Sequence, residues 1–225
     1  MKKINTLIAA CALMLMTSIS SVMADSSNFA GPYIGLQGSS VGVGIDGKQL
    51  GGADDVNATT DAPVGYTGIA AGVEAGYAVP LGSMFLLDIG ASYIDGAATM
   101  TTHTSDPDAV GTIKLVVSQF YTGYIAPTIV LSDTASLYVK IARSEAKVDV
   151  TDRHVTNPGD LSGDTYAIGT RTVLPSGIFI RAEAGMTDYD NVKAQGLGTG
   201  DIPTTTTYEA DPTIAYGAIS LGFRF

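Results

Sequence analysis

Two short motifs in this 225-residue chain bring hydrolytic side chains together. His103 and Ser105 stand two residues apart, and a histidine beside a serine can activate the hydroxyl as a nucleophile against an ester. A second set could activate water through carboxylates and imidazole, and it comprises Asp106, Asp108, Asp152 and His154. Both motifs lie in acidic, polar stretches, where such short combinations are expected by chance. We therefore assign no catalytic residues.

The same polar stretches hold many Asp side chains, which are ligands that Ca²⁺ and Mg²⁺ accept. Their spacing does not follow the regular pattern of an EF-hand loop, so solvated acidic loops are the simpler interpretation. The sequence also contains no phosphate-binding glycine loop, no Cys/His cluster and no nucleotide fingerprint. We predict no metal site and no cofactor.

Composition narrows the class of protein. Hydrophobic residues make up 45% of the chain and charged residues only 15%. Beyond the N-terminus, however, no run approaches the roughly 18 apolar residues of a transmembrane helix, which excludes a polytopic helical protein. The formal net charge of -10 repels phosphate backbones, so we expect no nucleic-acid partner.

The first two dozen residues have the pattern of an export signal. Lys2 and Lys3 precede an apolar stretch at 7–16, and small residues end at Ala24. We predict a signal peptide over residues 1–24 and one domain over 25–225. A lipoprotein signal at Cys11 is disfavoured, because the apolar stretch before it is short and apolar residues continue after it.

The rest of the chain alternates apolar runs of period two with two kinds of connection. Short turns start near Pro80, Ser132 and Pro175, whereas long polar stretches occupy 46–63, 95–110, 149–163 and 188–211. The pattern predicts eight strands, at about 31–45, 65–79, 84–96, 111–131, 136–148, 164–174, 178–188 and 212–225. Thr-rich pieces such as 204–207 could extend the strands further.

Alternation along these segments assigns their faces. In the last segment one face is apolar and the other mixed; the apolar one consists of Ala215, Gly217, Ile219, Leu221, Phe223 and Phe225. A soluble sandwich would place Lys and Glu on its outer face, but these outer rows carry almost no charge, as in a transmembrane β-barrel. Gln119 and Arg143 fall on the lipid side, so we expect a bulge or an early membrane exit there.

The chain resembles the small eight-stranded outer-membrane barrels, the group of OmpX, the OmpA membrane domain and the opacity-type surface proteins. The resemblance rests on 31–36, on three short turns against four long loops, and on the terminal segment 220–225. It implies an all-β, eight-stranded antiparallel up-and-down transmembrane β-barrel in the bacterial outer membrane. The terminal pattern resembles the signal read by the barrel assembly machinery, and it comprises Ile219, Leu221, Phe223 and Phe225.

The resemblance also implies outer-membrane lipids and lipopolysaccharide as partners, together with an unknown extracellular partner. Within this wider group, the His103 and Ser105 spacing resembles that of lipid A deacylases. The Asp/His set resembles the catalytic pairs of omptin proteases, but those barrels have ten strands, and this chain has length and turns for eight.

Seven charged side chains fall on the inward faces: Glu74, Asp88, Lys140, Arg171, Arg181, Glu183 and Arg224, with Lys114 higher up. Eight strands leave an interior just wide enough for side chains, and charges removed from water must be paired. We predict a salt-bridged lumen in which Arg171 lies opposite Arg181. Glu183 is then diagonal to both arginines, while Glu74 and Asp88 point at them.

These observations favour a non-enzymatic surface protein that serves envelope integrity or a loop-mediated external interaction. A narrow porin-like pore for small solutes is the alternative, and a surface hydrolase is a third. Membership of such a group does not by itself supply a function.

Overall fold

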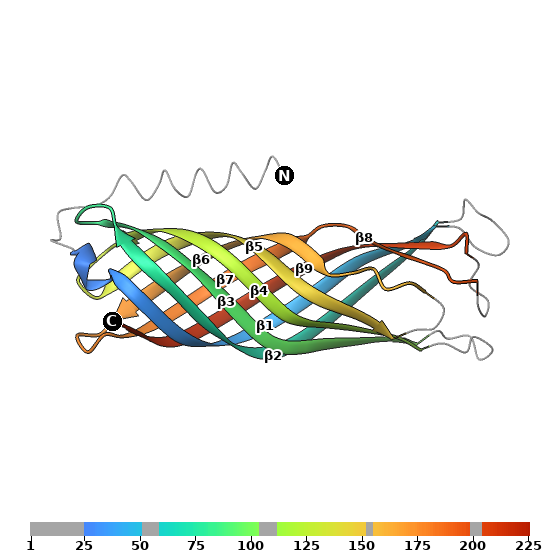
Figure 1. Cartoon of the computed structure of the whole chain (residues 1–225), viewed down its shortest axis with the longest axis horizontal. Coiled ribbons are helices and arrows are strands. Elements are labelled where there is room, and N and C mark those ends of the chain that lie inside the picture. Colours follow the sequence, from blue (N-terminus) through green and yellow to red (C-terminus); the bar gives the residue numbers. More distant parts are fainter. Residues whose placement is uncertain (1–24, 51–58, 104–111, 152–154, 199–203) are drawn as a thin grey trace.

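The computed structural model describes residues 25–50, 59–103, 112–151, 155–198 and 204–225 (Figure 1). Within these ranges it contains one 3₁₀ helix, η1 (Ser26–Asn28). The strands are β1 (Gly31–Leu50), β2 (Thr59–Pro80), β3 (Phe85–His103), β4 (Thr112–Val130), β5 (Ala135–Thr151), β6 (Leu161–Val173), β7 (Ile178–Tyr189), β8 (Val192–Gln195) and β9 (Thr207–Arg224). No helix in the described ranges has the length and apolar character needed to cross a membrane.

Eight of these strands form a closed antiparallel barrel. Each of β1 to β7 pairs with its neighbour in sequence, β7 pairs with β9, and β9 returns to β1. The predicted eight-stranded up-and-down barrel is therefore confirmed. The short strand β8 extends the wall by pairing with the N-terminal end of β9, inside a stretch that we predicted to be loop.

The strands run further than the sequence pattern predicts. β1 continues to Leu50 and β2 already begins at Thr59, so much of the first predicted loop is paired backbone. Threonine-rich ends favour this extension, because β-branched residues fit the extended conformation. The connections at the other end stay short. The third turn spans three residues between Leu174 and Ile178, and the backbone N–H of Leu174 donates to the carbonyl of Ile178.

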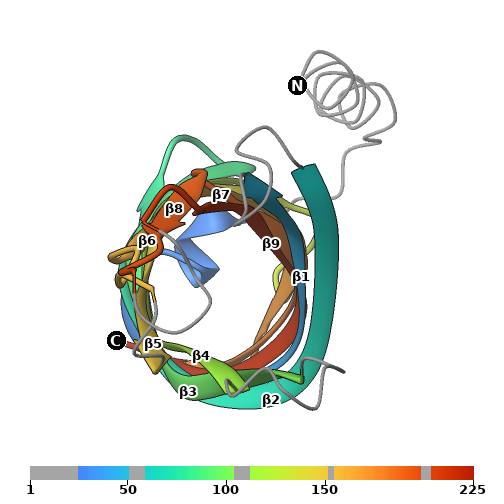
Figure 2. The same ribbon diagram turned by 90° about the vertical axis from the view of Figure 1, so that its right-hand side faces the viewer.

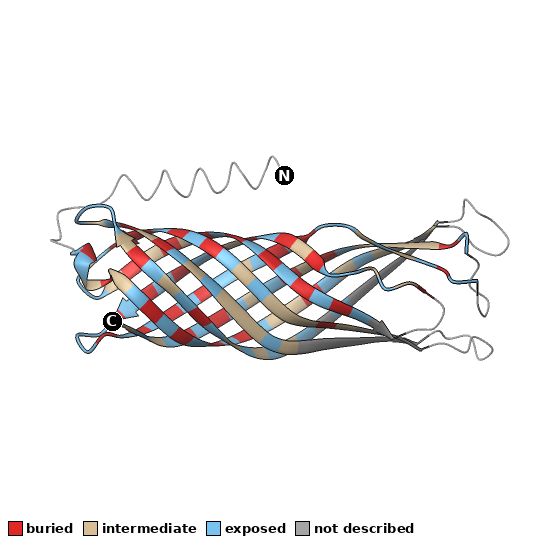
Figure 3. Cartoon of the chain, viewed as in Figure 1, coloured by how far each residue is buried: buried red, intermediate tan, exposed pale blue. Residues whose placement is uncertain are grey.

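Burial alternates along every wall strand, as the checkered colouring in Figure 3 shows. The outer rows are apolar; they include Ile34, Leu36, Ile69, Val73, Ile89, Ile125, Ile141, Ile168, Ile180, Ile219 and Leu221. Aromatic side chains flank this belt, with Tyr77, Phe85 and Phe225 towards the short turns and Tyr121 towards the loops. Apolar rows between aromatic girdles are the surface that lipid requires.

The two outward positions that fitted poorly have separate explanations. Gln119 sits in a β-bulge with a positive φ of 54°, and the pairing of β4 with β5 shifts between Ser118 and Tyr121. A bulge was one of the two alternatives that we expected from the sequence. Arg143 stays on the outer face, where its guanidinium contacts Asp164 at 2.9 Å and Asp190 at 2.5 Å. Such a cluster of exposed charges indicates that the wall has already left the hydrocarbon at this height.

The turn end of the barrel is covered by η1, which lies within the ring of strands in Figure 2. Ser26 anchors it through its backbone N–H to Ser83 O at 2.8 Å and through its hydroxyl to Gly82 O at 2.5 Å. Asp25 accepts a bond from the backbone N–H of Ser27, which lowers the pKa of the Asp25 carboxyl. Phe29 follows and is fully buried against Phe179 and its neighbours.

The wall is not uniformly paired. Pairing between β2 and β3 runs from Pro80 with Leu86 up to Ala71 with Asp95. Beyond that point, in the described residues, β2 pairs with β1 alone and β3 with β4 alone. Figure 1 shows the β1–β2 and β3–β4 hairpins diverging towards the end opposite η1. The wall between β2 and β3 therefore lacks backbone pairing above this point, although Ala70 and Gly96 still lie side by side.

Candidate functional site in the barrel lumen

The first layer of charges inside the barrel centres on Arg181 of β7. One guanidinium nitrogen contacts Glu74 of β2 at 2.8 Å, and the other contacts Asp88 of β3 at 2.8 Å. Asp88 also accepts the hydroxyl of Tyr33 at 2.5 Å, and Tyr33 is bonded to Tyr124 at 2.6 Å. All five side chains are buried. Charges from opposite walls thus neutralise each other across the lumen.

Arg171 lies beside this layer and is the cross-strand partner of Arg181. Its guanidinium contacts Asp88 at 3.3 Å and stacks on two aromatic rings, 4.5 Å from the centroid of Tyr33 and 4.7 Å from that of Phe179. Asp88 therefore serves two arginines, and the aromatic faces supply further attraction for the second.

A second layer, closer to the loops, centres on Glu183. Its carboxylate accepts bonds from Lys140, Tyr138 and Tyr216, each at 2.7 Å. The sequence led us to place Glu183 diagonal to the Arg171–Arg181 pair, and the register of β6 and β7 agrees with this position. Its ion-pair partner, however, is Lys140 and neither arginine. Glu74 and Asp88 already reach the arginines from the opposite wall, which leaves Glu183 for the lysine.

The remaining charged residues of the predicted network lie elsewhere. Arg224 takes part in none of the ion pairs among the described residues; it donates to the backbone carbonyls of Ala30 at 2.8 Å and Ser27 at 3.3 Å. Its effect is to tie the last strand to the segment around η1. The side chain of Lys114 lies outside what the structure describes.

The terminal residues of the predicted assembly signal lie on the outer face of the last strand. Their side chains are exposed; they are Ile219, Leu221, Phe223 and Phe225. The rings of Phe223 and Phe225 pack edge to face with centroids 5.2 Å apart. They thus extend the apolar belt at the turn end, and their reading by the assembly machinery stays a prediction.

Glycines opposite the lumen aromatics are a feature that we missed. Six inward aromatic side chains have a glycine as their direct cross-strand partner: Tyr33 with Gly76, Tyr124 with Gly90, Tyr138 with Gly169, Phe179 with Gly222, Tyr189 with Gly163 and Tyr216 with Gly185. At each glycine, an added Cβ would lie within 2.9 Å of that aromatic ring or its hydroxyl. Each ring thus occupies the space that its partner leaves empty.

We expect Gly90→Ala to destabilise the barrel by about 1–3 kcal/mol, the usual cost of overpacking. Its Cβ would meet the Tyr124 hydroxyl at 2.6 Å and the Ala75 carbonyl at 2.8 Å. Gly123→Ala is the matched control, because nothing lies within 4 Å of a Cβ there. Urea unfolding in lipid vesicles measures both, and an equal loss in the control would refute this packing argument.

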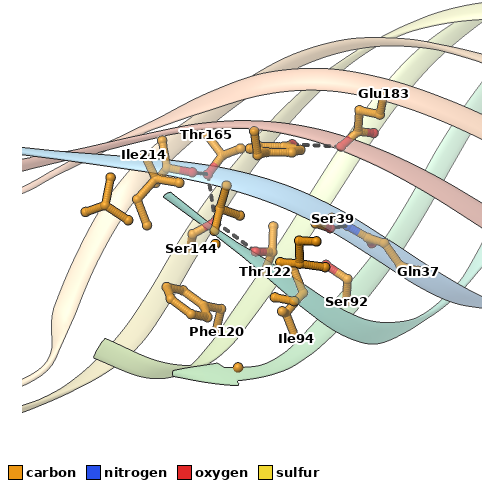
Figure 4. A pocket seen from close by; sticks show the side chains of 18 of the residues that line it. Gln37, Ser39, Ser92, Ile94, Phe120, Thr122, Ser144, Thr165, Glu183 and Ile214 are labelled. Atoms are coloured by element: carbon orange, nitrogen blue, oxygen red, sulfur yellow. Dashed lines mark hydrogen bonds between the residues drawn. The ribbon is translucent and has the colours of Figure 1, made fainter. Parts of the chain in front are cut away.

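Above the charge layers a chain of hydrogen-bonded hydroxyl groups runs along the inner face of four neighbouring strands, β4 to β7. Thr122, Ser144, Thr165 and Thr187 are linked in that order at 2.8, 2.6 and 2.7 Å. Figure 4 shows the first three of these side chains beside a pocket that extends from Glu183 to Ile214. The hydroxyls satisfy one another, so this level of the lumen is polar but uncharged.

Above the hydroxyl groups the lumen becomes apolar. The inward side chains form a buried cluster of Val43, Val117, Ala146, Val148, Leu161, Tyr189 and Ile214. Two cavities border it, of about 80 and 180 Å³, and they share Val43 and Ile214. The sequence did carry a signal for this cluster, since Val41, Val43 and Ile45 continue the inward parity of Ser39. We call this region the apolar chamber.

The motifs that suggested hydrolysis lie mostly outside the described residues. Ser105, Asp106, Asp108, Asp152 and His154 are not described, and His103 is described only as the end of β3. Among the described residues, no group of three or more His, Cys, Asp or Glu side chains is placed to hold a metal ion.

A closed antiparallel barrel with an apolar outer belt and a charge-paired lumen defines a small membrane-spanning barrel. Residues 9–200 match the family model described as outer membrane protein beta-barrel domain. The chain belongs to this family, which implies a location in the outer membrane of a Gram-negative bacterium. No curated protein matches the chain.

Solved structures are similar to this chain at low sequence identity. The outer membrane protein OprG from Pseudomonas aeruginosa is 11% identical, with 91% of this chain and 100% of that chain covered and a TM-score of 0.53. Ail of Yersinia pestis, in complex with the heparin analogue sucrose octasulfate, is 11% identical over 85% and 99% of the two chains, with a TM-score of 0.43. The Escherichia coli outer membrane protease OmpT is 10% identical over 93% and 99%, also with a TM-score of 0.43.

Proposed function

We propose that this protein is a non-enzymatic barrel of the cell surface, which serves envelope integrity or a loop-mediated interaction with the exterior. The observation that supports the proposal is the closure of the lumen on the η1 side. Phe29 and Phe179 fill the turn end, and the layers around Arg181 and Glu183 follow above them. Because these side chains are buried and paired, the geometry favours a role at the opposite, extracellular end of the barrel.

Closure of the lumen predicts that the protein does not conduct ions. Reconstituted in planar bilayers, the intact barrel is expected to give no steady single-channel current, since eight strands leave an interior filled by side chains. Large, stable, ion-selective channels would instead support the narrow porin-like pore. Circular dichroism of the same sample, with a β-rich spectrum, serves as the folding control.

The proposal includes a route to the surface. Residues 1–24 act as a cleaved signal peptide, the barrel assembly machinery reads the terminal pattern ending at Phe225, and the apolar belt then rests in lipid and lipopolysaccharide. N-terminal sequencing of protein from outer membranes tests the first step, with Asp25 expected as the first residue. The extracellular partner is the remaining element of the proposal.

The enzymatic alternative makes a narrower prediction. We expect His103→Ala, Ser105→Ala and His154→Ala to leave every surface phenotype unchanged, because a non-enzymatic barrel needs none of these side chains as nucleophile or base. Hydrolysis of lipid A esters and of peptides is the activity to assay. Loss of such an activity in any one variant, with the barrel still folded, would establish a surface hydrolase.

A further inference from the structure

The apolar chamber is unusual in its position. It lies at the loop end of the barrel, above the hydroxyl chain, on inward faces that carry Glu74, Asp88 and Lys140 nearer the turns. A lumen that only had to remain soluble at that end would carry polar side chains there, because apolar surface is costly to hydrate. The chamber instead has a polar floor and aliphatic walls.

The larger cavity has the size and lining of a site for an apolar molecule. Its volume is about 180 Å³, and its walls include Val43, Val117, Val148, Leu161, Pro212 and Ile214. An apolar cavity of roughly 150 Å³ in another protein stays free of water and binds benzene. The cavity here is similar in volume and is also lined by apolar side chains, but it is partly open.

The wall beside the chamber is weakest between β2 and β3. The smaller cavity is bordered by Gly68 and Ala70 on β2 and by Ile94 and Gly96 on β3, at the level where the pairing of these two strands ends. Just outside, Ile69 is 90% exposed. The unpaired part of the wall thus begins just above the Tyr93–Tyr121 contact of the outer girdle, whose rings lie 4.9 Å apart. It therefore faces the interfacial region of the outer leaflet.

We propose that the apolar chamber binds an uncharged apolar molecule or hydrocarbon chain, which enters from the outer leaflet between β2 and β3. The aliphatic walls favour burial of apolar surface, because such surface is costly to hydrate. The floor discriminates against charge, because Glu183 and Lys140 already neutralise each other. The layers below hold the ligand in the extracellular half of the barrel.

Methyl NMR of the valine-labelled barrel in nanodiscs tests binding, with benzene as the probe. The methyl signals of Val43, Val117 and Val148 are expected to shift saturably as benzene is added. Those of Val73, which is 45% exposed on the lipid face, should drift linearly because benzene also dissolves in lipid. Linear drift of all four residues would overturn the proposal.

A filled chamber provides the matched variant. Ala210→Phe places a ring in the larger cavity and should weaken saturable binding by about tenfold or more, whereas Ala215→Phe adds the same ring on the lipid face of the same strand and should not. The NMR spectra of both variants show whether each barrel is folded. Equal binding by the two folded variants would refute the chamber as the site.

A disulfide tests the entrance. A Cβ on Gly96 would lie 2.9 Å from that of Ala70. The variant is Ala70→Cys with Gly96→Cys in a Cys11→Ser background. Because the Cβ atoms of a disulfide lie about 3.8 Å apart, the two unpaired strand segments need to separate by only about 1 Å to form it. Benzene exchange into the chamber should slow in the oxidised form and recover on reduction. Identical exchange in the two forms would exclude this entrance.

The same sample distinguishes the two sources of an apolar ligand. Phospholipid with a spin label near the end of its acyl chain is expected to broaden the Val43 methyl signal if membrane lipid enters the chamber. Broadening would assign the site to acyl chains, and saturable benzene binding without broadening would assign it to free apolar molecules. If the Val43 methyl signal shows neither broadening nor a saturable shift, the proposal as a whole is overturned.

Discussion

Asp88→Ala is expected to lower the free energy of unfolding by about 3–5 kcal/mol, the cost of removing one partner from a buried ion pair. The loss falls on two cations, because both Arg181 and Arg171 contact this carboxylate. Tyr33 also loses the acceptor of its hydroxyl. Urea titration of the refolded barrel in vesicles, followed by β-sheet circular dichroism, measures the change.

The control for this substitution is Asp164→Ala on the outer face. Asp164 also contacts an arginine, Arg143, at 2.9 Å, but its side chain is 60% exposed. A solvated pair of this kind contributes about 0–1 kcal/mol. If the two substitutions lower the free energy of unfolding by similar amounts, the lumen charges are solvated. The argument for a closed interior would then fail.

The wall of the barrel could be predicted because successive residues of each strand face lipid and lumen in turn, so apolar residues recur with a period of two. Lipid on one side and a packed interior on the other force Ile219 and Leu221 to face one way and Ser220 the other. The same constraint flagged Gln119, since a polar side chain in an apolar row needs a bulge to restore the alternation. Local pattern was sufficient for these features.

The lumen was less predictable, because contacts across a barrel depend on strand tilt and stagger as well as on parity. The sequence showed that Glu183 faces inward, yet only the three-dimensional stagger decides that it meets Lys140 and not Arg171. The end of the pairing between β2 and β3 could not be predicted for a related reason. Side-chain alternation does not depend on whether a neighbouring strand is paired, so the sequence of β2 stays regular between Thr59 and Ala71, where β3 no longer pairs with it.

Register offers a further signal, which the sequence analysis used only for the two arginines. In an antiparallel hairpin joined by a short turn, the partner of each residue can be counted from the turn. Such counting from the turn between β6 and β7 correctly placed Arg171 opposite Arg181. Continued along the same two strands, it also sets Tyr189 opposite Gly163, and this is one of the aromatic–glycine pairs that pack in the lumen.

Glu183→Ala is the second substitution with a large expected effect, again about 3–5 kcal/mol, because it leaves the ammonium group of Lys140 buried without a carboxylate. Tyr138 and Tyr216 lose an acceptor in the same variant. The arginine layer should be unaffected, since Arg181 keeps both Glu74 and Asp88. Unfolding in vesicles again provides the measurement.

A second substitution identifies which cation the loss of Glu183 leaves unpaired. Adding Lys140→Met to Glu183→Ala removes the stranded charge, and we expect it to restore a large part of the lost stability, because an apolar replacement of a buried pair is often close to neutral. Adding Arg171→Met instead should lower stability further, since it breaks the contact with Asp88. If Arg171→Met is the change that restores stability, Glu183 serves the arginines in the membrane, and the two separate charge layers collapse into one.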